Sequence, residues 1–333
     1  MRQHETNEMK RVTILALRNA IATSVTGPFD VFGQAGVMWN FVNGMPLDRR
    51  FEVEVVTVDG QPAKCLSNIL IQPQRSIIEV QEPDLILIAS IANIDEVMAN
   101  NPETVDWLRH HYSQGTHLAS VCTGAYLLAE TGLLDGKTAT THWGFAHDFQ
   151  NRYPKINLRA DRLITDEGDL FCSGGPSSGA DLAFYLMDKY QGREVSLQCS
   201  KAMAHDFARR SQAPYSVFQV QKNHGDATIL VVQEYLEGNF GQPFSNASMA
   251  TKFGMSLRTF ERRFKKATGD TPLTYLKRVR VEAAKKLLET SSLTFAEITF
   301  QVGYEDVSSF RRVFIKNVGL RPKEYQQKFR YSL

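Results

Sequence analysis

Apolar runs alternate with amphipathic segments over the first 200 residues of the chain. Four runs are almost wholly apolar and predict buried strands: residues 12–17, 51–58, 85–89 and 117–121. Other segments carry apolar residues at helical spacing and predict helices: residues 28–39, 102–113, 123–130 and 177–190. Strands that alternate with helices predict an α/β fold built on a mostly parallel, doubly wound sheet.

The last part of the chain lacks this alternation and instead repeats itself at an offset of 50 residues. Seven residues recur in this way: Phe260, Arg262, Phe264, Lys266, Gly269, Pro272 and Tyr275 reappear as Phe310, Arg312, Phe314, Lys316, Gly319, Pro322 and Tyr325. Each copy predicts an amphipathic helix with two phenylalanines on the core side and basic residues outside. A short predicted helix and a glycine turn precede each copy. The pattern indicates an all-α domain with two helix-turn-helix units.

Capping residues predict where these helices begin. The expected N-caps are Asn246, Ser256, Thr294 and Asp306. Between the two units, Thr271-Pro272 predicts the start of a helix that runs to about Thr290, with an apolar side formed by Leu273, Leu276, Val279, Ala283, Leu287 and Leu288. A helix of that size is roughly 30 Å long, close to one turn of B-DNA. It could hold two recognition helices in successive stretches of the major groove.

Length and charge divide the chain in the same way. A chain of 333 residues is too long for one ordinary core, and we expect a first domain at 10–204, a linker at 205–225 and a second domain at 226–331. Residues 1–250 hold 20 Lys+Arg against 28 Asp+Glu, whereas residues 251–333 hold 18 against 8. Because this basic excess lies on the repeated helices, it favours a polyanionic partner.

The repeated region resembles the DNA-binding domain of AraC/XylS-type transcription regulators over about residues 226–331. The resemblance is carried by Gly303-Tyr304 and then by Phe310, Arg312, Phe314, Gly319 and Pro322, which are similar to that family's second helix-turn-helix unit. It implies double-stranded DNA as a partner, with bases contacted from the exposed early turns of the two basic helices.

By this resemblance, the expected base-contacting residues are Arg258, Thr259, Arg262, Ser308, Ser309 and Arg312. Arg262 and Arg312 are the first candidates because arginine commonly contacts guanine through two hydrogen bonds. The other basic residues of the two outer faces, which are typical of phosphate contacts, are Lys265, Lys266, Arg311 and Lys316. The alternative for any one of them is a solvated helix face without a role in DNA binding.

In the first domain, the strand at 117–121 runs directly into Cys122-Thr123-Gly124 and a helix. Ligands of doubly wound sheets bind at the carboxyl ends of the strands, where such a turn lies. A cysteine at this turn is expected to expose its sulfur and to have a pKa lowered by the helix N-terminus. His142 is a candidate partner, and Gly174-Gly175 could bring backbone close to a ligand.

The stretch from Cys122 to Trp143, together with residues 161–165 and 174–181, resembles the DJ-1/PfpI (class I glutamine amidotransferase-like) domains. It is most similar to the subgroup that is fused to AraC-type DNA-binding domains. The resemblance implies a flavodoxin-like fold, a dimer and a pocket beside the cysteine. In enzymatic relatives this cysteine works with a histidine and a carboxylate.

Two departures from the catalytic pattern argue against an enzyme. Thr123 stands where the peptidases of the family have a histidine. Residues 19–26 contain no acidic residue where other relatives place a glutamate, and Asp30 lies in the following predicted helix. A cysteine and a histidine without an orienting carboxylate lack one member of the usual catalytic set.

We therefore expect a transcription regulator, an activator by family resemblance, that responds to a small nitrogenous metabolite. The expected ligand-binding residues are Cys122, Thr123, His142, Gly174 and Gly175, with no cofactor and no metal. A homodimer is expected, and RNA polymerase is a candidate partner. One alternative is an amidase or glyoxalase-like enzyme that uses Cys122 and His142 and carries a DNA-binding domain. Another is a constitutive DNA-binding protein whose first domain only dimerises, with Cys122 as a packed remnant or a redox sensor.

The chain carries no feature of export or membrane insertion. Residues 1–11 are polar and do not resemble a signal peptide. No apolar stretch approaches the ~20 residues of a membrane span. Four cysteines (Cys65, Cys122, Cys172 and Cys199) lack paired or metal-type spacing, which is typical of reduced cytosolic thiols. We expect a cytoplasmic protein.

Overall fold

A computed structural model describes residues 8–207 and 209–330. Residues 1–7 and 331, which enter the expectations for the start of the chain and the end of the second domain, lie outside this description. The chain forms two compact units, and the boundary between them along the sequence falls between Gln212 and Ala213. This boundary lies inside the segment 205–225 that we expected to be a linker.

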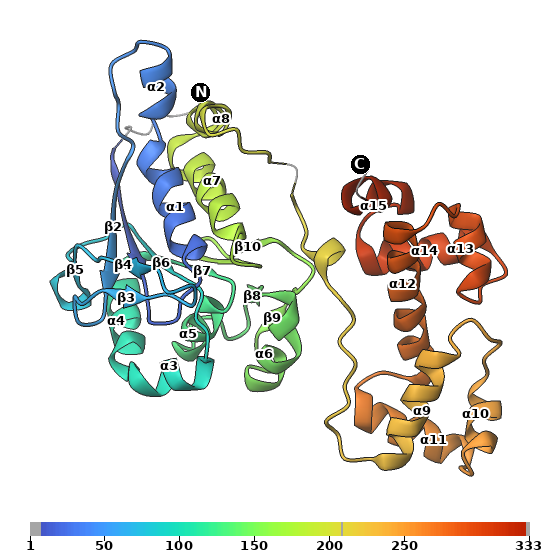
Figure 1. The fold of residues 1–333 in the computed structure, drawn as a ribbon. Coiled ribbons are helices and arrows are strands. Elements are labelled where there is room, and N and C mark those ends of the chain that lie inside the picture. The colour runs from blue at the N-terminus through green and yellow to red at the C-terminus, as the bar shows by residue number, and fades with distance from the viewer. Residues whose placement is uncertain (1–7, 208, 331–333) are drawn as a thin grey trace. The chain divides into compact units, whose positions relative to one another are not determined.

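The first unit is built on a seven-stranded sheet in the order β10-β11-β7-β6-β1-β2-β5 (Figure 1). Its strands are β1 (Lys10–Leu15), β2 (Phe51–Thr57), β5 (Arg75–Ser76), β6 (Leu85–Ile88), β7 (His117–Val121), β10 (Ile164–Asp166) and β11 (Leu170–Ser173). All neighbouring strands are parallel except β10 and β11. The four apolar runs form β1, β2, β6 and β7, and the mostly parallel, doubly wound sheet is confirmed.

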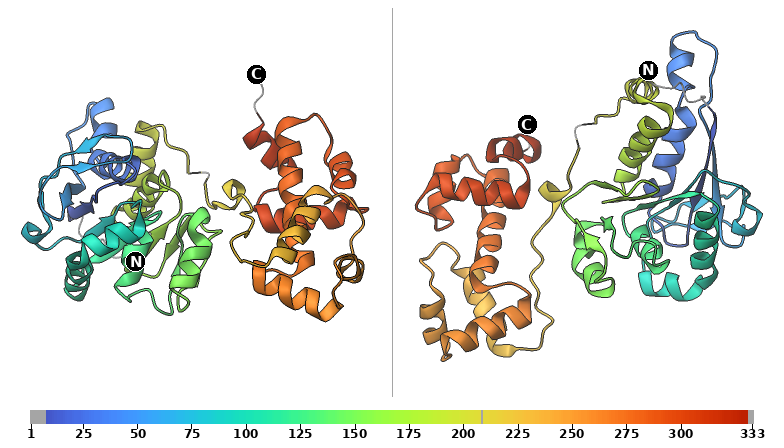
Figure 2. Two further views of the ribbon diagram at one scale, coloured as in Figure 1. Left: turned by 60° about the horizontal axis from the view of Figure 1, so that its bottom comes forward. Right: turned by 180° about the vertical axis from the view of Figure 1, so that it is seen from behind.

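Helices cover both faces of this sheet (Figure 1), and the same layers are visible from behind (Figure 2). One face carries α1 (Thr23–Gln34), α7 (Ser178–Gln191) and α8 (Arg193–Ala202), and the other carries α3 (Ile94–Asn100), α4 (Pro102–Ser113) and α5 (Gly124–Glu130). In β6, Leu85 and Leu87 join the core on one face and Ile86 and Ile88 the core on the other. Burial on both faces explains why the strands are apolar throughout.

Short elements complete the first unit. They are α2 (Met38–Val42), β3 (Ala63–Lys64), β4 (Leu70–Ile71), the 3-10 helix η1 (Ile77–Glu79), β8 (Thr138–Ala139), the 3-10 helix η2 (Trp143–Phe145), α6 (Ala146–Arg152) and β9 (Asn157–Leu158).

The helix that we expected at residues 28–39 begins and ends earlier, at Thr23 and Gln34. We had placed Pro28 at the first helical position, where proline is common. It is instead the sixth residue of α1 and is buried. Its missing N–H removes only the bond to the Ser24 carbonyl, close to the end where helical N–H groups lack partners anyway.

The second unit is all helical. Its elements are the 3-10 helix η3 (Ala213–Tyr215), α9 (Ala227–Gly238), α10 (Asn246–Lys252), α11 (Leu257–Thr268), α12 (Pro272–Thr290), α13 (Phe295–Gln301), α14 (Val307–Val318) and α15 (Pro322–Phe329). The expected all-α domain with two helix-turn-helix units is confirmed.

Helix α12 runs from the group of α9, α10 and α11 to the group of α13, α14 and α15 (Figure 1). It contributes to the small hydrophobic core of each group. Tyr275 at its start packs with the α11 phenylalanines, and Val281, Ala284 and Leu288 pack with those of α14. With 19 residues, α12 is roughly 28 Å long. The buried side of α12 differs from our expectation in that Leu273 is 45% exposed.

Most of the expected helix caps are confirmed. The side chains of Ser256, Thr294 and Asp306 accept hydrogen bonds from backbone N–H groups in the first turns of α11, α13 and α14. The prediction for α10 was wrong by one residue, because Ser245 is the cap and accepts from Ser248 N. Asn246 instead donates to Glu261 Oε1 (2.6 Å) and so ties α10 to α11. Across residues 8–207 and 209–330, the structure has no helix with the length and apolar character of a membrane span.

Candidate functional site

Helices α11 and α14 are held in the same way within their helix-turn-helix units. Phe260 and Phe264, like Phe310 and Phe314, are fully buried, so one side of each helix is fixed against the core. The turns before the two helices contain Gly254 (φ 67°) and Gly303 (φ 85°). Both φ values lie in the left-handed region, where glycine avoids the strain that a Cβ would cause.

The opposite sides of α11 and α14 carry the predicted DNA-binding residues. Eight of the ten are exposed: Arg258, Arg262, Lys265, Lys266, Ser308, Arg311, Arg312 and Lys316. Among the described residues, none of the cations in this set lies within 4.0 Å of a carboxylate. We call these eight residues, together with the half-buried Thr259 and Ser309, the basic faces. Their charge is available to a polyanion.

Three residues of these helices have an additional structural role. Thr259 is half-buried and accepts a hydrogen bond from the cap residue Ser256 (2.9 Å between the hydroxyl oxygens). The Arg311 guanidinium lies 5.8 Å from the centre of the Phe295 ring. Ser309 is half-buried, and its N–H donates to the Asp306 carboxylate (2.6 Å). Within the part of the chain that the structure describes, Arg262 and Arg312 carry no such constraint, which keeps them the first candidates for base contacts.

Arg280 is a buried arginine that sequence reasoning missed. Its Nε donates to Phe240 O (2.8 Å) and its Nη2 to Gln242 O (2.9 Å), while the guanidinium lies 5.2 Å from the centre of the Tyr304 ring. Burial lowers the pKa of this guanidinium. Arg280 therefore joins the loop between α9 and α10 to the turn of the second helix-turn-helix unit.

In the first unit, Cys122 lies at the carboxyl end of β7, at the predicted turn between a strand and a helix. Its backbone has a φ of 58°, and its N–H donates to Ser173 O at the end of β11 (2.9 Å). The expectation of an exposed, acidic thiol was wrong. Cys122 is 3% exposed, and burial raises the pKa of its thiol to about 11, although hydrogen bonds with Thr123 oppose that shift. The other three cysteines are buried free thiols as well.

Several predicted ligand-binding residues come together at this edge of the sheet. Thr141 Oγ1 donates to Cys122 O (2.9 Å), which places the His142 segment beside the turn. A Cβ added to Gly175 would lie 3.5 Å from His142 Cδ2, so these two residues adjoin. Thr123 is directed elsewhere, because its hydroxyl donates to Ile91 O and accepts from Ile91 N (3.0 Å).

His142 presents one nitrogen as a donor. Its Nδ1 accepts a hydrogen bond from Gly144 N (3.0 Å), and its ring lies 5.1 Å from the Trp143 ring centre. Burial lowers the pKa of the imidazole below its ordinary 6.5, so it is neutral at pH 7. With Nδ1 as acceptor, the proton of the neutral ring is on Nε2.

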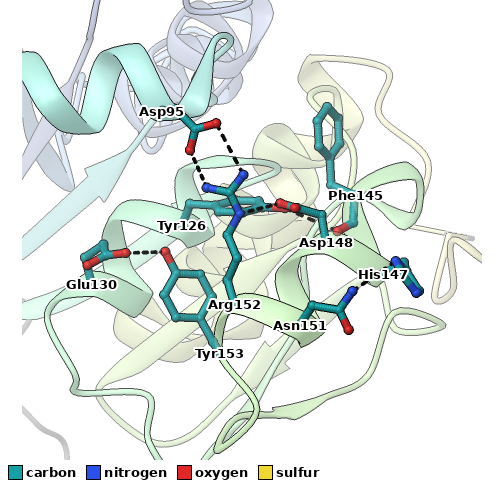
Figure 3. A network of polar contacts seen from close by, with 9 residues as sticks. All are labelled: Asp95, Tyr126, Glu130, Phe145, His147, Asp148, Asn151, Arg152 and Tyr153. Carbon is teal, nitrogen blue, oxygen red and sulfur yellow. Dashed lines mark hydrogen bonds and ion pairs between the residues drawn. The ribbon is translucent and has the colours of Figure 1, made fainter. Parts of the chain in front are cut away.

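A polar network fixes the segment that follows His142 (Figure 3). Arg152 at the end of α6 forms ion pairs with Asp95 of α3 and Asp148 of α6, and its hydrogen bond and positive charge lower the pKa of Asp95. Tyr126 of α5 donates to Asp148 Oδ2 (2.8 Å) and to Phe145 O (3.2 Å). The network ties α6 and η2 to the helix that begins at the cysteine turn.

Two families match the chain in comparisons with known proteins. A helix-turn-helix domain matches residues 249–328, and the DJ-1/PfpI family matches residues 10–189. The chain belongs to the DJ-1/PfpI family. Its DJ-1/PfpI domain precedes an AraC-type helix-turn-helix domain, which confirms the resemblance seen in the sequence.

Two sequence relatives and one solved structure are similar to this chain. The HTH-type transcriptional regulator CdhR of Pseudomonas aeruginosa is 26% identical over 81% of this chain and 80% of its own length. The isonitrile hydratase of Pseudomonas putida is 27% identical over 64% of this chain and 89% of its own length. Drosophila melanogaster DJ-1beta superposes with a TM-score of 0.52 over 60% of this chain and all of its own, at 20% identity, which supports the flavodoxin-like fold alone.

The isonitrile hydratase shows that a protein with this fold can be an enzyme. The fold therefore does not decide between ligand binding and catalysis. In this DJ-1/PfpI domain the thiol of Cys122 is protonated at neutral pH, because its pKa is raised to about 11. Asp30, the acidic residue that follows the first strand, lies exposed on α1.

Sequence reasoning also missed Gln212, which lies at this edge of the DJ-1/PfpI domain. Gln212 is 3% exposed, and its amide contacts the segment that carries His142. A glutamine in a polar stretch gives no sequence signal for such a position.

Proposed function

We propose that the protein is a sequence-specific DNA-binding transcription regulator whose DJ-1/PfpI domain binds a small nitrogenous metabolite. The observation that carries this proposal is the pair of basic faces on α11 and α14. Each follows a helix-turn-helix turn, and their cations have no carboxylate partner among the described residues. A basic helix in that position is what inserts into a major groove. The named function of CdhR supports the proposal.

In this proposal α11 and α14 occupy successive stretches of the major groove on one side of the duplex. The roughly 28 Å length of α12 suits this spacing, because one turn of B-DNA is roughly 34 Å long. Arg262 and Arg312 contact bases, whereas Lys265, Lys266 and Lys316 neutralise phosphates. Arg280 keeps the two helix-turn-helix units in register, because it contacts both the loop between α9 and α10 and the turn of the second unit.

The effector binds at the carboxyl ends of β7 and β11. His142 Nε2–H and the backbone of Gly174 and Gly175 supply polar groups there, and Cys122 forms the buried floor. An effector changes DNA binding only through different affinities for two states of the protein. We further propose that the protein acts as a cytoplasmic homodimer and, as an activator, contacts RNA polymerase.

A second candidate function is catalysis at Cys122, favoured by the likeness to isonitrile hydratase. Incubation with an electrophilic ester or a dicarbonyl, followed by mass spectrometry, separates the two. Rapid stoichiometric acylation or turnover at Cys122 supports the enzyme. A third candidate, a constitutive DNA-binding protein, predicts that no metabolite changes its affinity for DNA.

The proposal is tested by selecting bound sequences from a random duplex library with the full-length protein. We expect one enriched motif with two half-motifs about 10 base pairs apart, and affinity that falls as salt rises. A protein that enriches no sequence and ignores duplexes at low salt is not this regulator.

A further inference from the structure

The Gln212 side chain occupies a polar recess in the DJ-1/PfpI domain. Its Nε2 donates to Thr141 O (2.7 Å), Thr140 Oγ1 (3.2 Å) and Arg162 O (3.2 Å), and its Oε1 accepts from Trp143 N (3.2 Å). Acceptors surround the amide nitrogen and a donor faces the amide oxygen. The recess is thus complementary to a planar carboxamide.

Gly174 leaves the room that this amide needs. A Cβ added there would lie 2.7 Å from Gln212 Cδ and Oε1 and 2.9 Å from Nε2. The neighbouring Gly175 differs, since among the described residues its added Cβ would meet His142 Cδ2 alone, at an ordinary 3.5 Å. The recess therefore adjoins the proposed effector site, with Gly174 on one side and the His142 segment on the other.

The residues before Gln212 are held on the same domain. Gln212 N donates to Asp161 O (3.1 Å), and Ser211 forms a β-bridge with Arg162. Arg209 pairs with the buried carboxylate of Asp181 in α7 and donates to Ser177 Oγ (3.2 Å). The end of the first unit is thus attached by the Arg209–Asp181 ion pair, by backbone contacts of Ser211 and Gln212, and by the Gln212 amide.

The residues after Gln212 are attached to the DNA-binding unit. Ala213 is the first residue of that unit, and the Tyr215 ring lies 5.4 Å from the Phe329 ring of α15. Ser216 O accepts a hydrogen bond from Lys285 Nζ of α12, the helix between the two basic faces. Three residues separate Gln212 from Ser216.

We propose that Gln212 is a latch: its amide holds the chain that leads to the DNA-binding unit against the DJ-1/PfpI domain. An effector releases the latch when its own carboxamide or ureido group takes the place of the Gln212 amide. Such a ligand offers the same planar arrangement of N–H donors and a carbonyl acceptor. Its binding removes the side-chain attachment of Gln212 and changes the constraint that the DJ-1/PfpI domain places on α12 through the chain. This inference rests on the proposed function and specifies its effector class and its route of regulation.

The latch is tested by displacing the Gln212 amide from its recess without changing Gln212 itself. Gly174→Ala introduces the clash, and Gly175→Ala is the matched control; neither glycine has a positive φ. Full-length variants are digested briefly with trypsin, and cleavage after Arg209 and Arg210 is followed by mass spectrometry. Cleavage by opening of a segment tracks the open population, so we expect Gly174→Ala and Gln212→Ala to be cut roughly tenfold faster than the wild type.

The double variant Gly174→Ala/Gln212→Ala shows whether the clash acts through the amide. It should be cut no faster than Gln212→Ala alone, because the alanine at 174 then has nothing to displace. Equal cleavage of Gly174→Ala and Gly175→Ala overturns the latch. So does an additive effect in the double variant.

The ligand class is tested with propionamide, which has the chemistry of the Gln212 side chain. Millimolar propionamide should raise the melting temperature of Gln212→Ala more than that of the wild type, whose recess is filled. Propionate, which has no N–H, should raise neither. If propionamide does not distinguish the two proteins, the carboxamide assignment is wrong. These experiments contain no DNA, so their failure is distinguishable from a failure of the wild type to bind duplexes.

Discussion

Replacing Arg262 with alanine should weaken specific DNA binding without unfolding the protein. The Arg262 side chain is exposed on the side of α11 opposite Phe260 and Phe264, and it has no carboxylate within 4.0 Å among the described residues. Substitutions at exposed helix positions usually change stability by no more than about 0.5 kcal/mol. A bidentate arginine–guanine contact discriminates by about 1–3 kcal/mol. We therefore expect a roughly 5- to 150-fold rise in Kd on the specific site.

The assay is fluorescence anisotropy of the full-length protein on its selected site and on a scrambled duplex at one fixed salt concentration. The matched control is Arg263→Ala, one residue further along α11. Arg263 pairs with Asp226, the N-cap of α9 (2.6 Å between Nη2 and Oδ1), and this contact lowers the pKa of Asp226. Removing Arg263 should lower the melting temperature and leave the ratio of specific to non-specific affinity unchanged.

Two results would refute the reasoning about Arg262. An equal loss of affinity on both duplexes would assign it to the phosphate backbone, where contacts carry no sequence information. A fall in melting temperature as large as that of Arg263→Ala would mean that its effect arises through folding.

Other predictions concern phosphate contacts, packing and the buried thiol. Lys266→Ala and Lys316→Ala should each weaken binding to all duplexes and reduce the slope of log K against log salt by about 0.9; an unchanged slope contradicts phosphate contact. Gly303→Ala should destabilise the protein by about 1–3 kcal/mol more than Gly254→Ala. Both glycines have positive φ, but only the Cβ at 303 would lie 2.7 Å from a guanidinium and a carbonyl oxygen; equal thermal unfolding would refute this. Alkylation of Cys122 by iodoacetamide should be slow at pH 7 and rise about tenfold per pH unit towards its pKa of about 11, because only the thiolate reacts. A rate at pH 7 like that of a free thiol would contradict this burial.

Much of the second unit could be predicted because its signals are local. The start and end of α11 depend on Ser256 and Gly269, which lie next to the helix in sequence. The buried charges of α12 could not be predicted. Charged residues are ordinarily exposed, and Arg280 is buried because carbonyl groups about 40 residues earlier accept its hydrogen bonds. Lys285 likewise depends on the distant Ser216.

The candidate effector site was predictable only in part. The turn at Cys122 follows from a strand that ends at a short helix, and the structure brings His142 and Gly175 near it. The exposure of its sulfur was predicted wrongly, because burial there depends on segments that are distant in the sequence. The position of Gln212 depends on four partners from two stretches of chain, residues 140–143 and Arg162, that lie 50 or more residues earlier, and no pattern in one sequence encodes that set.

The most direct test of two DNA-contacting helices is hydroxyl-radical footprinting of the full-length protein on its selected site. We predict two protected segments about one helical turn apart on the same side of the duplex. Arg262→Ala should weaken one of them and Arg312→Ala the other. A single protected segment that neither substitution alters would contradict the account.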